Sequence, residues 1–418
     1  MKFNKWTLGL AAVGAVSMAS AVRADDAPKP SALNTALSNT TISGYVSTSV
    51  NWLVNHSDDG DSIGEKIPLQ AGKSDGFNLD VVKLVIAKPE DQTPWASGYE
   101  VDLLFGPDAA GYNNSVSSNT GSQNSQSEVA IQQAFVTLRT PVGNGIDWKF
   151  GVWNTVIGYE SFDAGSNPNY TRSWGWAVEP TEHTGILASY TVNDQISFNA
   201  GVANTLEAGI NVRNTYKNNT GDQTSSWNKA FMGSATYTAP SSWGWAAGSA
   251  FYAGMVYGFA GGTEGAGGDQ GGNQQNYYVG ATLNSPWKQV TFGASFDYVQ
   301  NLGGTTAIVG NNIHINDYIV GLYSTYKATD KLSFNTRGEY WEADGFSDSY
   351  KGGDGGIEIS EDLEYDLWAN VQSRLEVRYD KATSSLGAGG PALLPNGTFV
   401  SYNEAATVGV YANIIYKF

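Results

Sequence analysis

Side chains that commonly perform enzyme chemistry are scarce in this sequence. It contains no Cys and only three His, which are His56, His183 and His314. A serine hydrolase needs a His beside its nucleophile, and the common zinc proteases need two His on one helix. The sequence contains neither a Gly-x-Ser-x-Gly turn nor a His-Glu-x-x-His segment. It therefore predicts a protein that is not an enzyme, with no cofactor and no catalytic metal.

Charged side chains form a second group with possible chemistry, because they alternate with apolar ones. In the segment SRLEVRYD the charged residues share one face, namely Arg374, Glu376, Arg378 and Asp380. Arg337 and Glu339 alternate in the same way within KLSFNTRGEYW. Alternation with period two indicates a β-strand with two different faces. A row of charges opposite an apolar face is typical of a strand between a water-filled lumen and lipid.

Sixteen segments with this alternation follow one another along the chain. We expect strands near residues 40–53, 77–88, 97–105, 128–140, 145–156, 182–192, 194–205, 227–239, 243–257, 274–285, 288–300, 312–327, 331–342, 357–368, 371–381 and 403–418. Short turns alternate with long loops, which we expect at 54–75, 106–127, 157–180, 206–226, 258–273, 301–311, 343–356 and 382–402. Backbone groups have no water partners in lipid, so a spanning sheet must close on itself. The pattern predicts an all-β, transmembrane antiparallel β-barrel, with short periplasmic turns and long extracellular loops.

The N-terminal residues have the character of an export signal. Lys2 and Lys5 precede an apolar run, and small residues end at Ala24. This pattern predicts a signal peptide over residues 1–24, a short periplasmic segment over 25–39 and the barrel over 40–418. Cleavage removes three basic residues and no acidic one, which takes the formal net charge from −17 to −20. We do not expect a chain this acidic to bind nucleic acid, because contacts with phosphate need clusters of Lys and Arg.

The last strand ends in an aromatic residue rather than a polar tail. Ile414, Tyr416 and Phe418 share one apolar face. We expect this strand to pair with the first one and so to remove the open edge of the sheet. A terminal Phe on such a strand resembles the signal by which barrel proteins are recognised by the outer-membrane assembly machinery.

The third long loop and its flanks carry a family resemblance. The segment GVWNTVIGYESFDAGSNPNYTRSWGWAVEPTEHTGILASYTVND resembles the OmpL-like β-barrel porin family of Gram-negative bacteria, and TTISGYVSTSVNW resembles that family's first strand. The matching residues are Gly158, Tyr159, Glu160, Asp163, Tyr170, Arg172, Ser173, His183, Thr184 and Gly185. The resemblance implies a porin in the outer membrane, and sixteen-stranded porins commonly form homotrimers.

The position of the third loop adds an expectation to that resemblance, since in sixteen-stranded diffusion porins this loop folds into the barrel and narrows the pore. We expect a constriction formed by Glu160, Asp163, Arg172, Arg337, Arg374 and Arg378. In it Glu160 and Asp163 face basic residues of the wall, for which Arg337, Arg374 and Arg378 are the candidates. Acids opposed to bases across a narrow passage produce a transverse field that discriminates among solutes. The alternative is a surface loop whose charges are solvated. Tyr159 and His183 are candidate anchors between loop and wall, although a His also suits a pH-sensitive gate.

Two acidic stretches, 56–65 and 358–366, are dense enough to attract Ca²⁺ or Mg²⁺, which would bridge lipopolysaccharide phosphates. They lack the ligand spacing of the twelve-residue Ca²⁺ loop, so we favour a solvated acidic surface for both.

These observations favour passive diffusion of small hydrophilic solutes and ions through a water-filled channel. The expected partners are outer-membrane lipids, lipopolysaccharide and the assembly machinery. The alternative is an adhesion or ligand-binding barrel that uses its long loops. An energy-coupled transporter is disfavoured, because only about 15 residues lie between the predicted cleavage site and the first strand, too few for the plug inside such barrels.

Overall fold

The computed structural model describes residues 39–54, 73, 75–111, 129–206, 209–211, 215–217, 223–225, 229–260, 272–300, 306–308, 311–313, 316–344, 354–382, 391–393, 399–401 and 406–418. The predicted signal peptide, the acidic stretch 56–65 and nearly all of the segment 25–39 lie outside these residues. Among the described residues, no helix has the length and apolar character that crossing a membrane requires.

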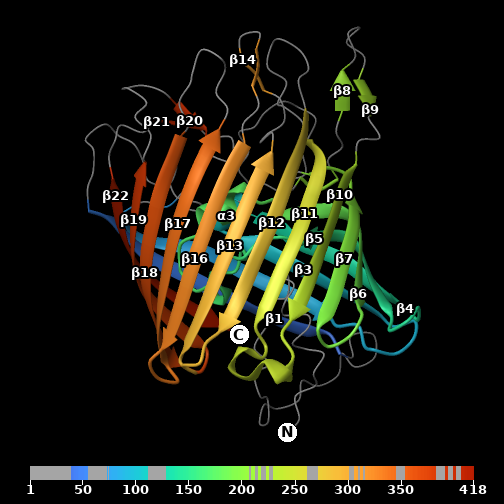
Figure 1. The fold of residues 1–418 in the computed structure, drawn as a ribbon, viewed down its shortest axis with the longest axis horizontal. Helices are drawn as coiled ribbons and strands as arrows, with labels where there is room; N and C mark the ends of the chain where they lie inside the picture. The colour runs from blue at the N-terminus through green and yellow to red at the C-terminus, as the bar shows by residue number, and fades with distance from the viewer. Residues whose placement is uncertain are drawn as a thin grey trace.

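Sixteen antiparallel strands form one closed barrel (Figure 1). In order around the barrel they are β1 (Thr41–Leu53), β2 (Gly76–Lys88), β3 (Ser97–Phe105), β4 (Val129–Thr140), β5 (Ile146–Asn154), β6 (Glu182–Thr191), β7 (Ile196–Ala203), β10 (Ala230–Thr238), β11 (Ala250–Ala260), β12 (Gly272–Asn284), β13 (Val290–Gln300), β16 (Asn316–Lys327), β17 (Leu332–Asp344), β18 (Asp354–Trp368), β19 (Val371–Ala382) and β22 (Thr407–Lys417). The prediction of an all-β barrel with sixteen strands is confirmed.

The barrel closes where its last strand meets its first. β22 pairs with β1 from Leu53↔Gly409 to Tyr45↔Lys417. Phe418 extends this seam, because its backbone N–H donates to the Gly44 carbonyl at 2.9 Å and its carbonyl accepts from Gly44 N–H at 3.0 Å. Every edge of the main sheet is therefore paired.

The two faces of the strands follow the predicted alternation. The side chains of Ile414 and Tyr416 on β22, and of Phe418 directly after it, are about half exposed on the outer face, whereas Asn413 and Ile415 are buried on the inner one. On β19 Leu375 and Val377 are exposed. The charged residues that alternate with them, Arg374, Glu376 and Arg378, are buried inside the barrel.

One strand begins later than its sequence pattern predicts. The expected strand 243–257 is β11 (Ala250–Ala260), and its first residues instead belong to η3 (Ser241–Ala246). Trp243 and Trp245 imitate the period of a strand, but Gly244 has φ of +63° and breaks the extended chain. Both indoles are exposed in this short connection, as suits aromatic residues at a membrane interface.

The other small elements lie in the long connections. Three two-stranded sheets pair β8 (Thr215–Lys217) with β9 (Gln223–Ser225), β14 (Thr306–Ile308) with β15 (Asn311–Ile313), and β20 (Pro391–Leu393) with β21 (Phe399–Ser401). They stand beyond the barrel at the end opposite the C-terminus (Figure 1). The remaining helices are α2 (Pro107–Gly111), η2 (Ala164–Ser166) and α3 (Trp174–Val178). Of these, η2 and α3 belong to the loop that carries the candidate site.

Candidate functional site: a loop bound to the inner wall of the barrel

Residues 157–180, which we call the inner loop, connect β5 to β6 and lie within the barrel, where Figure 1 shows α3 behind the strands at the front. Most of their side chains are buried. The Ser173 side chain caps α3 by accepting a hydrogen bond from Trp176 N–H at 3.0 Å. This cap is the expected role for Ser at the first helical turn.

Arg337 of β17 is the strongest link between the wall and the inner loop. Its guanidinium donates to Glu160 Oε1 at 2.9 Å and to the Thr171 carbonyl at 2.7 Å. It also donates to both carboxylate oxygens of Glu358 on β18, each at 3.1 Å. The side chains of Arg337, Glu160 and Glu358 are wholly excluded from solvent. The buried arginine therefore has acid partners from both the loop and the wall.

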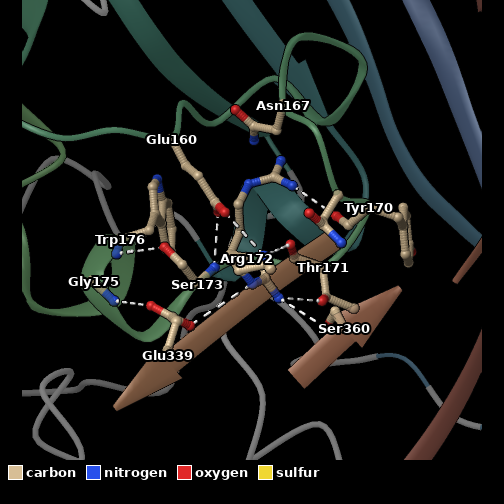
Figure 2. A network of polar contacts seen from close by, with 12 residues as sticks. Glu160, Asn167, Tyr170, Thr171, Arg172, Ser173, Gly175, Trp176, Glu339 and Ser360 are labelled. Atoms are coloured by element: carbon tan, nitrogen blue, oxygen red, sulfur yellow. Dashed lines mark hydrogen bonds and ion pairs between the residues drawn. The ribbon is translucent and has the colours of Figure 1, made fainter. Parts of the chain in front are cut away.

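Carboxylates hold the backbone of the same part of the loop. Glu160 accepts from Ser173 N–H at 2.8 Å, and Glu339 of β17 accepts from Trp174 N–H at 2.7 Å and Gly175 N–H at 3.1 Å (Figure 2). Glu376 of β19 accepts from Tyr170 N–H at 2.6 Å. Hydrogen bonds to charged groups are about twice as strong as neutral ones, so these carboxylates fix the position of the loop backbone.

The arginines of β19 bind loop carbonyls rather than loop acids. Arg374 donates to Ala164 O at 2.6 Å and Asn167 O at 2.8 Å. Arg378 donates to Arg172 O at 2.6 Å and to its strand neighbour Asp380 at 2.7 Å. Both guanidinium groups thus lie against the inner loop, with their charges covered by it.

Asp163 lies away from all three wall arginines. Its partner is Lys83 of β2, whose ammonium lies 2.9 Å from Asp163 Oδ2 and 3.0 Å from Asp102 of β3. Tyr45 of β1 also donates to Asp163, at 2.9 Å. The expectation that Asp163 faces Arg337, Arg374 or Arg378 is wrong, because the loop spans the lumen and its two acids reach different walls.

Arg172 also differs from expectation. It is buried and donates to the carbonyls of Tyr170, at 2.8 Å, and of Phe162. Both acceptors belong to the inner loop itself, so Arg172 braces the loop internally and presents no charge toward an open passage.

The two residues predicted to join loop and wall make direct contacts. The Tyr159 ring stacks on Tyr323 of β16 with centroids 4.1 Å apart. It needs Gly293 of β13, since a Cβ there would lie 1.8 Å from the Tyr159 hydroxyl. His183 of β6 is fully buried, and its Nε2 lies 3.2 Å from the Thr155 hydroxyl just before the loop.

Glu179 was not among the residues singled out from the sequence, and it lies in an acidic environment at the end of the loop. Burial raises its pKa well above the usual carboxyl range, and the adjacent Asp297 of β13 raises it further. Gly158 leaves room for it, because a Cβ at Gly158 would meet Glu179 Oε2 at 2.2 Å. Gly158 also has φ of +115°, a conformation that favours glycine.

The acidic stretch 358–366 is not the solvated surface that its composition predicts. It forms part of β18, where Glu358 and Asp362 point into the barrel and are fully buried. Among the described residues, no group of three or more His, Cys, Asp or Glu side chains is arranged to hold a metal ion.

In this arrangement the charges of loop and wall are in direct contact rather than separated by water. Glu160 and Arg337 are neutralised locally, as are Asp163 and Lys83. These pairs therefore do not produce the predicted transverse field, which requires opposed charges separated by water. Their contacts instead hold a folded loop inside the lumen.

Comparisons with known proteins agree with this architecture. The family model described as beta-barrel porin-2, OmpL-like, matches residues 39–415. The outer membrane channel DcaP of Acinetobacter baumannii has a similar structure, with a TM-score of 0.55 at 13% identity over 91% of this chain and 97% of that one. The anion-selective porin of Comamonas acidovorans is similar with a TM-score of 0.54 at 13% identity, over 91% of this chain and 99% of that one. The trimer form of OmpT of Vibrio cholerae is similar with a TM-score of 0.53 at 13% identity, over 91% of this chain and 99% of that one. A search of curated proteins found no match.

Proposed function

Because the chain belongs to the β-barrel porin-2, OmpL-like family, we propose that it is an outer-membrane porin for passive diffusion of small hydrophilic solutes and ions. In this proposal the inner loop narrows the channel. The protein is a channel and not an enzyme.

The observation that carries the proposal is the path of the inner loop across the lumen. Asp163 is bound to Lys83 of β2, Val178 O accepts from Asn276 of β12 at 2.8 Å, and Glu160 is bound to Arg337 of β17. β2 lies opposite β12 in the strand order of the barrel, and β17 lies on the wall between them. A loop bound to all of them must cross the interior and leave less of it open to water.

We assign the proposed constriction residues two kinds of role. Glu160, Asp163, Arg337, Arg374 and Arg378 hold the loop to the wall, and Arg172 holds the loop to itself. Tyr159 and His183 anchor its first turn and its base. These contacts set the position of the loop and hence the size of the remaining passage. The net charge of the mature chain favours cations at the channel mouths.

Export and assembly follow the family pattern in this proposal. The signal peptide is cleaved after Ala24, the barrel assembly machinery recognises the strand that ends at Phe418, and the barrel then lies among lipids and lipopolysaccharide. The similar OmpT barrel has a trimer form, and we propose a homotrimer here as well.

Single-channel recording tests the proposal. Purified protein in planar bilayers should give stepwise conductance in KCl, and neutral sugars of increasing size should reduce ion current until they no longer enter. Heat-unfolded protein from the same preparation is the control. A folded barrel that inserts without opening steps would contradict the channel function and favour a binding role for the long loops.

A further inference from the structure

A carboxylate lies on the outer face of the barrel, where lipid is expected. Glu361 of β18 is exposed between Ile359 and Leu363, which are also outward and exposed. Its Oε2 accepts a hydrogen bond from the Thr336 hydroxyl of β17 at 2.6 Å. Thr336 pairs with Glu361 on one side and with Ser324 of β16 on the other. We call Ser324, Thr336 and Glu361 the outer polar row.

The row lies midway between two aromatic belts. Tyr365 is four residues from Glu361 toward the short turns, and Ile357, four residues the other way, pairs with Tyr340. At about 3.3 Å per residue, each belt is about 13 Å from Glu361 along the strand. Aromatic girdles mark the two membrane interfaces of such barrels. Glu361 therefore lies near the middle of the hydrocarbon layer.

The rest of the outer surface is different at this depth. Other strands present exposed apolar side chains near their centres, such as Val136 of β4, Val279 of β12 and Val320 of β16. Among the described strand residues that point outward away from strand ends, Glu361 is the one ionisable side chain. Ionisable groups are costly in hydrocarbon, and where they occur they usually have a protein partner.

The chemistry of the row suits a second copy of itself. The Thr336 hydroxyl binds one oxygen of Glu361, which leaves the other oxygen as an acceptor. The Ser324 hydroxyl makes no side-chain hydrogen bond with the described residues, so it can donate. Gly338 follows Thr336 on the same face, and it lets a neighbouring surface approach closely. Where copies of the row meet around a symmetry axis, each offers its neighbour both a donor and an acceptor.

We propose that the outer polar row is a contact between copies of this chain within the membrane, so that β16, β17 and β18 form part of a subunit interface. The inference deepens the proposed homo-oligomer by naming its surface. It rests on the barrel lying in a membrane and does not depend on whether the channel conducts.

The chain has no Cys, so single cysteines report on one position each. Ile359→Cys and Leu363→Cys flank Glu361 and leave it in place, and Val279→Cys is the matched outward control on β12. Each purified variant is labelled with bimane and reconstituted in vesicles that contain lipids brominated in mid-chain. We expect strong quenching at position 279 and loss of most of that quenching at positions 359 and 363. Equal quenching at all three positions would mean that lipid covers the row, which would overturn the proposal.

Oxidative crosslinking of the unlabelled variants identifies the occupant. We expect covalent dimers from Ile359→Cys or Leu363→Cys and only the collision background from Val279→Cys. Adding Glu361→Leu should reduce the dimers, while heat-modifiable migration on gels shows that the barrel is still folded. Dimer yields that match the Val279→Cys background would overturn the proposal. Absence of conductance would count against the porin function alone.

Discussion

Arg337 Nη1 lies 2.9 Å from Glu160 Oε1, and this ion pair joins a wall strand to a loop residue 177 positions earlier, with neither side chain exposed to solvent. Arg337 also faces Glu339 and Glu358. One guanidinium thus balances several buried carboxylates, and the position of the inner loop depends on it.

Arg337→Gln should release the inner loop. The substitution leaves Glu160 buried without its cation and Glu358 with only Arg378, 3.8 Å away. Breaking a buried pair in this way costs about 3–5 kcal/mol. We expect larger and noisier single-channel conductance in planar bilayers. Arg139→Gln is the control, because Arg139 pairs with Asp147 at the short-turn end of the barrel. Equal conductance in the parent and Arg337→Gln would show that the loop does not limit the passage.

Neutralising both loop acids should move selectivity toward anions. The double variant Glu160→Gln with Asp163→Asn removes the acid that the inner loop presents to Arg337. It also leaves Lys83 with Asp102 as its remaining acidic partner. We expect the reversal potential in a KCl gradient to shift toward the anion value. Glu342→Gln, which neutralises one outward acid, is the control. A reversal potential that stays at the parent value would place these charges outside the ion path.

Gly293→Ala should displace Tyr159 from its stack on Tyr323. The new methyl group would lie 1.8 Å from the Tyr159 hydroxyl, and overpacking of this kind costs about 1–3 kcal/mol. We expect a lower thermal unfolding temperature and altered conductance. Gly233→Ala of β10 is the matched control, because its nearest neighbour, the Asn199 carbonyl, is 3.5 Å from the new Cβ. Equal effects from the two substitutions would contradict the packing argument.

The end of the inner loop should loosen as pH rises. The pKa of Glu179 is raised by burial first and by Asp297 second, with Glu160 and Glu339 also nearby and Tyr278 facing it from β12. A carboxyl with a raised folded pKa stabilises the folded state at low pH, and this stabilisation is lost as pH rises through the raised value.

We therefore expect current fluctuations to increase as pH rises above the normal carboxyl range. Glu179→Gln, which stays neutral, should remove most of this pH dependence. The same pH dependence in Glu179→Gln and in the parent would assign it to another group.

Deleting Phe418 should impair assembly more than stability. The backbone of Phe418 makes two hydrogen bonds with Gly44, and these bonds form one end of the long seam between β22 and β1. We expect a reduced level of heat-modifiable barrel in the outer membrane, and nearly unchanged thermal unfolding of protein refolded in detergent. Equal membrane levels of the deletion and the parent would argue against a terminal assembly signal.

Much of the barrel was predictable because strand faces are a local property. Arg374, Glu376 and Arg378 alternate with Leu375 and Val377, and a period of two alone assigns them to opposite faces. The pattern fails where the backbone is irregular. In β2 the charged residues Asp80 and Lys83 are three positions apart, so a strict period of two would place them on opposite faces. Both point inward, because a bulge in β2 interrupts the pairing opposite Ser47 and Thr48.

The site was less predictable, because its partners are distant in sequence. Glu160 and Arg337 were both candidates from the sequence, and the structure brings them together. Lys83 was missed as the partner of Asp163, although a lone Lys within the apolar segment VVKLV indicates an inward charge. Glu179 carried no comparable signal, since its neighbour Asp297 belongs to a strand more than a hundred residues later.

The sequence by itself determined the strand number, the lipid-facing and lumen-facing residues, and the family, because each depends on local alternation or on a contiguous motif. Only the tertiary structure decided which acid meets which base, that Arg172 braces its own loop, and that Glu361 lies at mid-depth on the outer face. These relationships arise from barrel closure and register, which place residues side by side that no local pattern connects.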